Sequence, residues 1–345
     1  MKKIALCSLI LLPLLANAQP DSTAPLRFLQ AVVMPDVPKG PYSDHLAVDL
    51  QGHRLFATPQ AWKSVQVIDF TTGKLLHTIG GIGNPHSVLY RQDLDQIFVT
   101  DGDAGLLRIY DGKEYKQLKT IENLPDADSI GYDPITKYLY VTTASKGAGA
   151  EASALSIVDT TTAKRLGDIK LPAKSPEAMA METSGPRIFV DLMDQNKVAV
   201  IDRQKRELVA VWPITKCKKV IAAGLDETHH RLFVGCRDTE TSGTLDVMDS
   251  QTGKELETYP LGGWVDYIAY DPATGRIYAS CGAPVPDGGG VYVFQTTDQG
   301  HYTLISRTPT APRAKTALFV PEIKRLFVSV PHFEGDARIL FYQVE

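Results

Sequence analysis

A short apolar run of β type recurs seven times along the chain. Its clearest copy is Arg231-Leu232-Phe233-Val234, in which one charged residue precedes three apolar ones. A nearly constant period in the forties, carried by a strand-forming pattern, is typical of β-propeller blades. The second residues of the copies are Leu55, Ile97, Leu139, Ile188, Leu232, Ile277 and Leu326, which gives spacings of 42, 42, 49, 44, 45 and 49.

Each repeat contains four short segments with strand character. A small apolar run comes first, and a turn rich in Asp, Pro, Thr and Gly, such as residues 271–275, leads into the recurring element. The third segment is apolar with an occasional polar residue between apolar ones, and usually ends in Asp, as in residues 65–69. A further turn leads to the fourth segment, for example residues 207–211. The pattern predicts an all-β fold, a seven-bladed β-propeller with four-stranded blades.

The two ends of the sequence indicate how the ring closes. The last repeat supplies only three strand segments, and a spare segment of strand character lies at residues 26–33. We expect this N-terminal strand to complete the seventh blade, because closure removes an unpaired strand edge. Inserts rich in small residues, 144–153 and 282–290, follow the second strands of two repeats. They could rim one mouth of the propeller or be tolerated surface insertions.

The first eighteen residues have the pattern of a secretory signal peptide. Lys2 and Lys3 precede an apolar run over residues 4–15, and a small-x-small motif follows at residues 16–18. The apolar run is too short to span a membrane. We expect cleavage after Ala18, which leaves residues 19–345 as a single propeller domain, periplasmic or secreted. No later segment approaches 18 uninterrupted apolar residues, so we expect no membrane span.

The charge of the chain bears on its partners. The formal net charge is −4, and removing Lys2 and Lys3 with the signal peptide lowers it to −6. A mildly acidic surface argues against a general nucleic-acid binder, which needs a basic stripe. We therefore expect a monomer whose partner is a small molecule or a protein.

Three cysteines remain after the signal peptide. In an oxidising compartment they allow one disulfide and a spare thiol. Cys217 precedes an innermost strand and Cys236 ends the strand that pairs with it, so we favour this pair over any involving Cys281. Three small buried thiols are the alternative, which the sequence leaves open.

The repeats align the residues that begin each innermost strand. A step back of eleven residues from the second residue of each copy, or ten in the shorter first repeat, reaches an ionisable residue in six repeats. Innermost strands of a propeller begin at the central channel near one mouth, so we expect a polar ring there. The ring consists of His45, His86, Asp128, Glu177, Asp266 and Lys315, with Ile221 in the fifth repeat. Candidate neighbours are Asp103, Asp191, Lys218, Lys219, Arg237, Trp264, Arg313 and His332.

Several functions fit such a ring. Lys315 and Arg313 could hold the anionic group of a ligand, which suits the function that we favour, a binding mouth without catalysis. The imidazoles and carboxylates could bind a divalent cation, Ca²⁺ or Zn²⁺, or act as general acid and base. The sequence demands no cofactor. Polar residues also line the wet channels of inert propellers, so the ring alone does not establish a site.

The third-strand pattern Val-x-Val-Ile-Asp, the Thr-Gly-Lys turn and the Asp-Pro-x-Thr hairpin resemble the YVTN-repeat (YncE-like) β-propeller family. The resemblance covers essentially the whole chain after residue 18 and implies a seven-bladed propeller outside the cytoplasm, in a family with many members of unassigned activity. The closest copies of the name-giving motif are residues 98–101 and 140–143.

Related propellers extend the range of functions that the resemblance implies. They include metal-dependent lactonases, whose Glu, Asn and Asp ligands project from inner strands. By that likeness Glu177 and Asp266, joined by His86 of the same ring, are candidate metal ligands. A lactonase-like hydrolase is thus the alternative function, although no Asn occupies the ring. Binding of single-stranded nucleic acid is a second alternative, against which the acidic charge argues.

Overall fold

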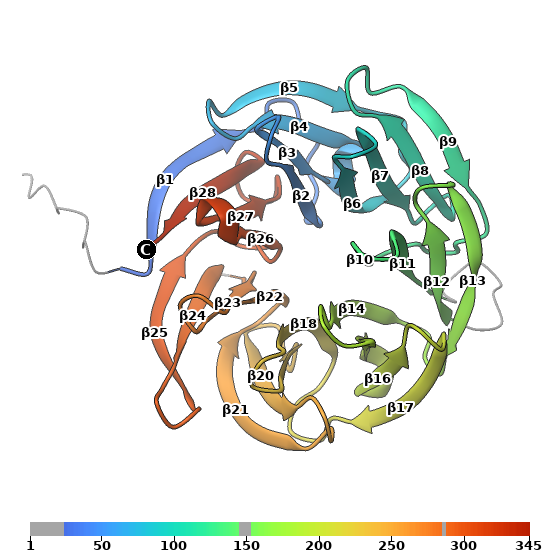
Figure 1. The fold of residues 1–345 in the computed structure, drawn as a ribbon. Helices are drawn as coiled ribbons and strands as arrows, with labels where there is room; N and C mark the ends of the chain where they lie inside the picture. The colour runs from blue at the N-terminus through green and yellow to red at the C-terminus, as the bar shows by residue number, and fades with distance from the viewer. Residues whose placement is uncertain (1–23, 145–152, 285–287) are drawn as a thin grey trace, which may run out of the picture.

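Seven four-stranded sheets are arranged in a ring around a central axis, and Figure 1 shows this ring as a ribbon. This computed structural model describes residues 24–144, 153–284 and 288–345. The predicted signal peptide, residues 145–152 of the first insert and residues 285–287 of the second lie outside the described residues. Within each sheet the strands pair antiparallel, so the described chain is the all-β, seven-bladed propeller that the repeats predicted.

Each blade runs from an innermost strand to an outermost strand. The innermost strands of blades one to seven are β2 (Leu46–Asp49), β6 (Pro85–Arg91), β10 (Ile130–Asp133), β14 (Pro176–Met181), β18 (Val220–Asp226), β22 (Val265–Asp271) and β26 (Ala317–Val320). The second strands, which contain the recurring apolar run, are β3 (Arg54–Ala57), β7 (Gln96–Asp101), β11 (Tyr138–Thr143), β15 (Arg187–Leu192), β19 (Arg231–Cys236), β23 (Arg276–Cys281) and β27 (Arg325–Val330).

The outer half of each blade follows the same order. The third strands are β4 (Val65–Asp69), β8 (Leu106–Asp111), β12 (Ser153–Asp159), β16 (Lys197–Asp202), β20 (Ser242–Asp249), β24 (Gly290–Thr296) and β28 (Arg338–Val344). The outermost strands are β5 (Lys74–Ile79), β9 (Gln117–Ile121), β13 (Lys164–Leu171), β17 (Glu207–Pro213), β21 (Glu255–Gly262), β25 (Tyr302–Pro309) and, in blade seven, β1 (Leu26–Val33).

The recurring apolar run is buried on both faces of its blade. Successive side chains of a strand point to opposite faces. In blade five, Leu232 packs with blade four while Phe233 packs with blade six, and neither is exposed to solvent. A strand that is covered on both sides reads as a continuous apolar run, which is why this element stands out in the sequence.

The N-terminal strand closes the ring, as the sequence predicted. β1 pairs antiparallel with β28, from Leu26 opposite Val344 to Val33 opposite Arg338, with a bulge between Phe28 and Gln30. In Figure 1 this puts the first described strand at the outside of the last blade, beside the C-terminus.

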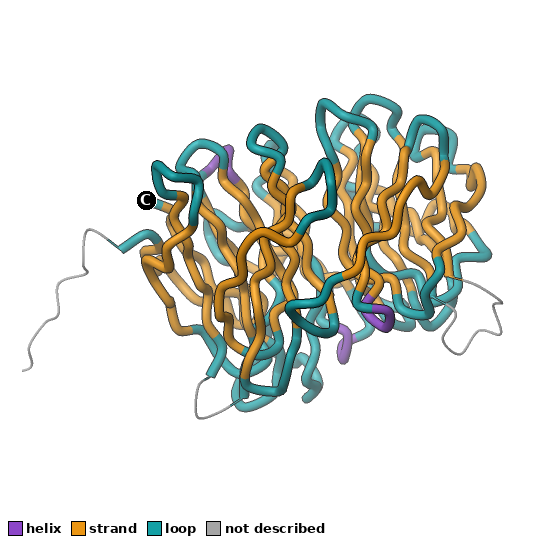
Figure 2. The backbone as a smooth tube through the Cα atoms, turned by 90° about the horizontal axis from the view of Figure 1, so that it is seen from below, coloured by secondary structure: helices purple, strands orange, loops and turns teal. Residues whose placement is uncertain are grey.

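Helical structure is confined to three single turns in the described part of the chain. These are the 3₁₀ helices η1 (Gln60–Trp62), η2 (Met193–Gln195) and η3 (Pro321–Ile323). Among the described residues, therefore, no helix is long and apolar enough to pass through a membrane. Seen from the side in Figure 2, the strands run between two faces made of loops, and η1 and η2 each precede a third strand.

Two neighbouring valines in β1 test the closure of the ring. Val32 is 6% exposed and belongs to a cluster with residues of blades one and seven, whereas Val33 is 51% exposed. We expect Val32→Asp to lower the free energy of unfolding by about 3 kcal/mol, because it buries a charge among apolar side chains. Val33→Asp should change the same quantity by less than about 0.5 kcal/mol. Urea denaturation measures both, and equal effects would contradict a tightly packed β1.

Candidate ligand-binding site at the channel mouth

A pocket of about 370 Å³ lies where the innermost strands begin, and all seven blades contribute side chains to it. This volume lies within the range of small-molecule sites. The structure thus brings together His45, His86, Asp128, Glu177, Ile221, Asp266 and Lys315, the seven positions that the repeats aligned. The remaining lining residues are Tyr42, Asp44, Gln60, Ser129, Ala178, Met193, Arg237 and Trp264.

Carboxylates and imidazoles gather on the side formed by blades one to three. His86 Nδ1 lies 2.9 Å from Asp44 Oδ2 and 3.4 Å from Asp128 Oδ1. Gln60 Nε2, at the start of η1, is 3.0 Å from the same Asp44 oxygen and 3.1 Å from His86 Nδ1. His45 Nε2 lies 3.5 Å from the other oxygen of Asp44. Three successive blades therefore present polar atoms to one point.

These groups shift one another's protonation equilibria. Burial disfavours the charged form of His86, but the charges of Asp128 and Asp44 outweigh it and raise the pKa of His86 to about 10. Burial also works to raise the pKa of Asp44, yet the neighbouring His45 and His86 hold it well below its usual range. For Asp128 burial prevails, and its pKa is raised. The pKa values of the two carboxyl groups are therefore shifted in opposite directions, and Asp44 is the one that more readily stays negatively charged.

A second layer of residues fixes the ring of His86. Its Nε2 lies 2.9 Å from Asn84 Nδ2. The buried Asp101 accepts hydrogen bonds from the backbone N–H groups of Gly83 and Asn84 at 2.9 and 3.0 Å. Gly102 packs so closely that an added Cβ would lie 2.9 Å from the imidazole. The ring is therefore held in place with its Nδ1 towards the carboxylates.

Cationic and aromatic side chains gather on the side formed by blades five to seven. Arg237 and Lys315 both form ion pairs with the one carboxylate of Asp266, which is 9% exposed. The guanidinium of Arg313 stacks on Trp264, with its central carbon 3.7 Å from the ring centroid. Arg313, which the sequence placed among the residues that could hold an anion, stacks on Trp264 and does not itself line the pocket.

Trp264 has an unusual backbone conformation for a bulky residue. Its φ is +59°, in the left-handed region, and its indole Nε1 donates a 2.7 Å hydrogen bond to Glu240. The ring of Tyr42 is stacked against it, with the centroids 6.4 Å apart. A left-handed tryptophan is strained, and such strain is concentrated at functional positions.

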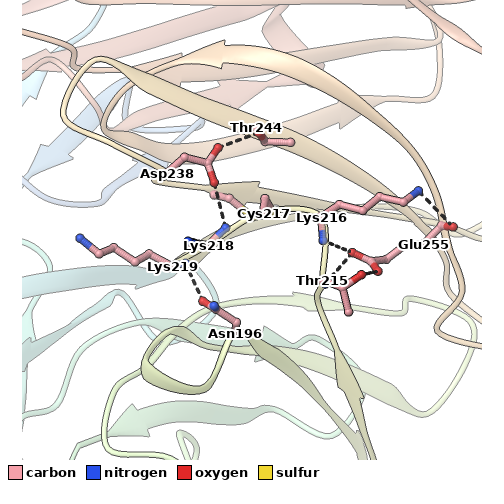
Figure 3. The surroundings of a disulfide bond; sticks show 10 residues. Asn196, Thr215, Lys216, Cys217, Lys218, Lys219, Asp238, Thr244 and Glu255 are labelled. Atoms are coloured by element: carbon pink, nitrogen blue, oxygen red, sulfur yellow. Dashed lines mark hydrogen bonds between the residues drawn. A yellow bond between two sulfur atoms is a disulfide. The ribbon is translucent and has the colours of Figure 1, made fainter.

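The fifth blade presents Ile221 in place of an ionisable residue, and the segment before it is firmly anchored (Figure 3). A disulfide joins Cys217 to Cys236, the pair favoured from the sequence, and the buried Cys281 is a free thiol. Backbone N–H groups on either side of Cys217 donate to Glu255, Asp238 and Asn196 at 2.9, 2.9 and 2.6 Å. These contacts fix the residues that lead into β18.

Hydroxyl groups just after the recurring run connect neighbouring blades. Thr58 Oγ1 lies 2.9 Å from the carbonyl oxygen of His45 and 3.1 Å from that of His86 in the next blade. Thr100 Oγ1 donates to the carbonyl of Asp128 at 3.0 Å. The ring residues are therefore positioned through their backbones as well as their side chains. The equivalent positions, three residues after the aligned one, are Thr58, Thr100, Thr142, Asp191, Gly235, Ser280 and Ser329.

Asp191 and Gly235 depart from this series, and Asp191 puts a carboxyl group where most blades have a hydroxyl. It is 1% exposed, and neither of its carboxyl oxygens has a hydrogen-bond partner among the described residues. Burial raises its pKa well above the usual range. Burial thus favours the neutral, protonated form of Asp191 in the folded protein.

The structure changes the set of candidate metal ligands. The sequence suggested Glu177, Asp266 and His86, but Asp266 is engaged by two cationic side chains. Within the described residues, the His, Cys, Asp and Glu side chains that converge closely enough to hold an ion are those of Asp44, His86 and Asp128. Asp44 was missed because it precedes the aligned position by one residue.

Together, the fold and this pocket define a seven-bladed β-propeller with a ligand-sized polar pocket at one mouth of its channel. No family model matches the chain. The protein named "Uncharacterized protein YncE" from Salmonella typhi is 29% identical over 124 residues, and its counterpart from Salmonella typhimurium is 28% identical over the same length. Each match covers 36% of this chain and 35% of the relative, so the chain spans about a third of the length of the curated relatives it matches. This partial homology and the seven-bladed ring agree with the likeness to YncE-like β-propellers that the sequence predicted.

Solved structures share the fold at low sequence identity. The WD40 repeats of RRP9 superpose with a TM-score of 0.75 at 12% identity, covering 95% of this chain and 99% of theirs. A chain of the mitotic checkpoint complex gives 0.73 at 16% identity, covering 100% and 99%. Hydrazine synthase of Kuenenia stuttgartiensis gives 0.72 at 16% identity, covering 91% and 99%. These likenesses show the propeller architecture alone.

Replacing Asp191 by the hydroxyl residue of other blades should stabilise the protein. The pKa of Asp191 is higher in the folded than in the unfolded state, so its presence costs more stability as pH rises above about 4. We expect Asp191→Thr to raise the free energy of unfolding by about 1–3 kcal/mol at pH 8, and by less at pH 5. Thr142→Asp, the reverse change in blade three, should have the opposite effect. A gain that does not depend on pH would contradict this account.

The disulfide should contribute measurably to stability. Cys217 and Cys236 are separated by 19 residues, and a cross-link of that span stabilises by about 3 kcal/mol. The double change Cys217→Ala and Cys236→Ala should lower the free energy of unfolding by about this amount. A reducing agent should destabilise the natural protein and leave the double variant unaffected. Equal sensitivity of both proteins to the reductant would refute the assignment.

Proposed function

We propose that this protein binds a small anionic molecule at the mouth of its channel, and that it does so outside the cytoplasm. One observation carries the proposal: Arg237 and Lys315 share the single carboxylate of Asp266 at the edge of the pocket. That side of the pocket has one more positive than negative charge. A buried charge without a counter-charge is costly, so an anion would be held strongly there.

The aromatic side chains support the same ligand class. Trp264 and Tyr42 lie next to the two cations, with Lys315 Nζ 6.0 Å from the Tyr42 ring centroid and the guanidinium carbon of Arg237 5.2 Å from that of Trp264. They would cover the apolar part of a ligand whose anionic group contacts Arg237 and Lys315. The pocket volume of about 370 Å³ suits a small molecule.

Nucleophilic catalysis receives little support from the pocket. Ser129, His45 and Asp44 lie together, but Ser129 Oγ and Asp44 Oδ1 are both nearest to the same imidazole nitrogen, Nε2, at 3.4 and 3.5 Å. A serine nucleophile needs a base whose two nitrogens serve the serine and the carboxylate separately. We therefore propose binding and not acyl transfer.

Metal-dependent hydrolysis is the second candidate function, and one observation favours it. Asp44, His86 and Asp128 converge in the pocket that Lys315 also lines. A bound cation there could polarise a ligand held by Arg237 and Lys315. Turnover of a lactone that stops on chelation would favour this candidate over binding alone.

Two features support a location outside the cytoplasm. The first eighteen residues have the signal-peptide pattern, and a disulfide such as Cys217–Cys236 is favoured in an oxidising compartment. N-terminal sequencing of the exported protein should begin at Gln19. A mature protein that retains Lys2 and Lys3 would refute this part of the proposal.

Removal of the charge of Lys315 tests anion binding. Lys315→Met keeps the length of the side chain and removes its charge, so affinity for an anion should fall by about 10-fold or more. The probes are inorganic phosphate, acetate and succinate, added to metal-free protein and followed by thermal shift and calorimetry. Lys324→Met, which changes an exposed lysine, is the matched control. If no probe binds the natural protein, or if Lys315→Met binds equally well, the proposal is wrong.

A further inference from the structure

We propose that Asp44, His86 and Asp128 form a binding site for a divalent transition-metal ion, of which Zn²⁺ is the type case. The site goes beyond the anion binding proposed above and does not depend on it. The three residues come from blades one, two and three, and one ligand atom of each lies within 4.8 Å of the others.

The distances match those within a coordination sphere. Metal–ligand bonds of about 2.0–2.2 Å place two donor atoms of the same ion about 3 to 4 Å apart. His86 Nδ1 is 2.9 Å from Asp44 Oδ2 and 3.4 Å from Asp128 Oδ1. The ligand atoms of Asp44 and Asp128 lie within 4.8 Å of each other, so small side-chain movements would bring all three atoms to one ion.

The imidazole presents Nδ1 to the two carboxylates. A ligating histidine binds the ion through one ring nitrogen and donates the N–H of the other to an outer acceptor. Asn84 presents Nδ2 to Nε2 at 2.9 Å, so an ion on Nδ1 would require the Asn84 amide to turn and offer its oxygen. The Nε2 of His86 contacts Asn84, whose own backbone is fixed by Asp101, and Gly102 leaves room for the ring. Nδ1 is therefore the nitrogen that faces the two carboxylates.

The charge of the cluster also favours a cation. Two carboxylates face one imidazole, and Asp44 is only 8% exposed. His86 Nδ1 and Asp44 Oδ2 lie 2.9 Å apart, which is an ordinary hydrogen-bond distance. A divalent ion would replace that hydrogen and face both carboxylates at once.

The ligand types select the class of metal. Ca²⁺ and Mg²⁺ prefer sites made wholly of oxygen ligands, whereas imidazole suits zinc and its transition-metal neighbours. Three protein ligands leave at least one coordination position open, as in catalytic zinc sites. That position would face the pocket, since all three residues line it. An ion here could thus contact an anion held on the Lys315 side.

Calorimetric titration of the full chain, stripped of metal with a chelator, tests the site. We expect about one Zn²⁺ per chain and much weaker binding of Ca²⁺. Asp44→Asn, His86→Gln and Asp128→Asn should each weaken Zn²⁺ binding by more than about 10-fold, because each removes one of three ligands. His229→Gln is the matched control, because His229 also contacts an aspartate, Asp226, at 2.7 Å but has a single carboxylate and lies outside the pocket.

A variant outside the three ligands is included in case the ligand variants do not fold. Asn84→Ser leaves all three ligands in place and alters only the partner of His86 Nε2, so it should weaken Zn²⁺ binding by about 10-fold. Absence of saturable Zn²⁺ binding to the folded natural protein overturns the proposal. So does binding that all these variants retain unchanged.

The metal and anion sites can be told apart by two variants. Lys315→Met should keep Zn²⁺ binding and lose affinity for phosphate measured in metal-free buffer. His86→Gln should lose Zn²⁺ binding and keep that affinity for phosphate. Each claim can therefore fail without the other.

Discussion

The burial of each second strand on both faces is the constraint on which the rest of the molecule depends. Leu232 needs blade four and Phe233 needs blade six, so no blade can complete its core without two neighbours. This mutual dependence requires a closed ring, and it keeps the register between first and second strands nearly constant from blade to blade. Constant register is what carries residues separated by forty or more positions in sequence to one end of the channel. The position of the pocket thus follows from the packing of the blades, and each blade contributes a different residue to its lining.

Acidic and basic side chains come from different blades of the pocket. Blades one to three contribute Asp44, His86 and Asp128, whereas Arg237 and Lys315 come from blades five and seven with Asp266 between them. A ligand in such a pocket experiences a gradient of potential across a few ångströms, so its orientation is determined as strongly as its affinity. Ile221 and the segment before it, which the disulfide anchors, belong to blade five, as does Arg237. A fixed backbone there helps to hold the like-charged Arg237 and Lys315 near each other.

The fold could be read from the sequence because its determinants are local and repeated. The recurring run, the turn residues and the spare strand at residues 26–33 each follow from burial or backbone conformation, and seven copies average out the exceptions. The site was only partly predictable. Counting back from Leu55 reached His45 but not Asp44, because both lie in the loop before β2, where no strand periodicity says which side chain turns inward. Arg313 was named with the ring because the sequence cannot show that its guanidinium stacks on Trp264 and does not itself line the pocket. Asp191 was named as a neighbour of the ring, but its burial without a hydrogen-bond partner among the described residues depends on three-dimensional packing that the sequence does not show.

The pairing of β1 with β28 has a consequence for how the chain reaches its native state. Leu26 has to find Val344, so the pairing that completes the ring joins residues from the two ends of the described chain. Contacts between residues far apart in sequence form slowly, because the entropy of closing a long loop is lost before packing contributes any stabilisation. Until then the strand made first has no partner, and the outer edge of β28 stays open to strands of other molecules. Refolding yield should therefore be governed by protein concentration, with dilution favouring the closed monomeric ring over exchange of β1 between chains.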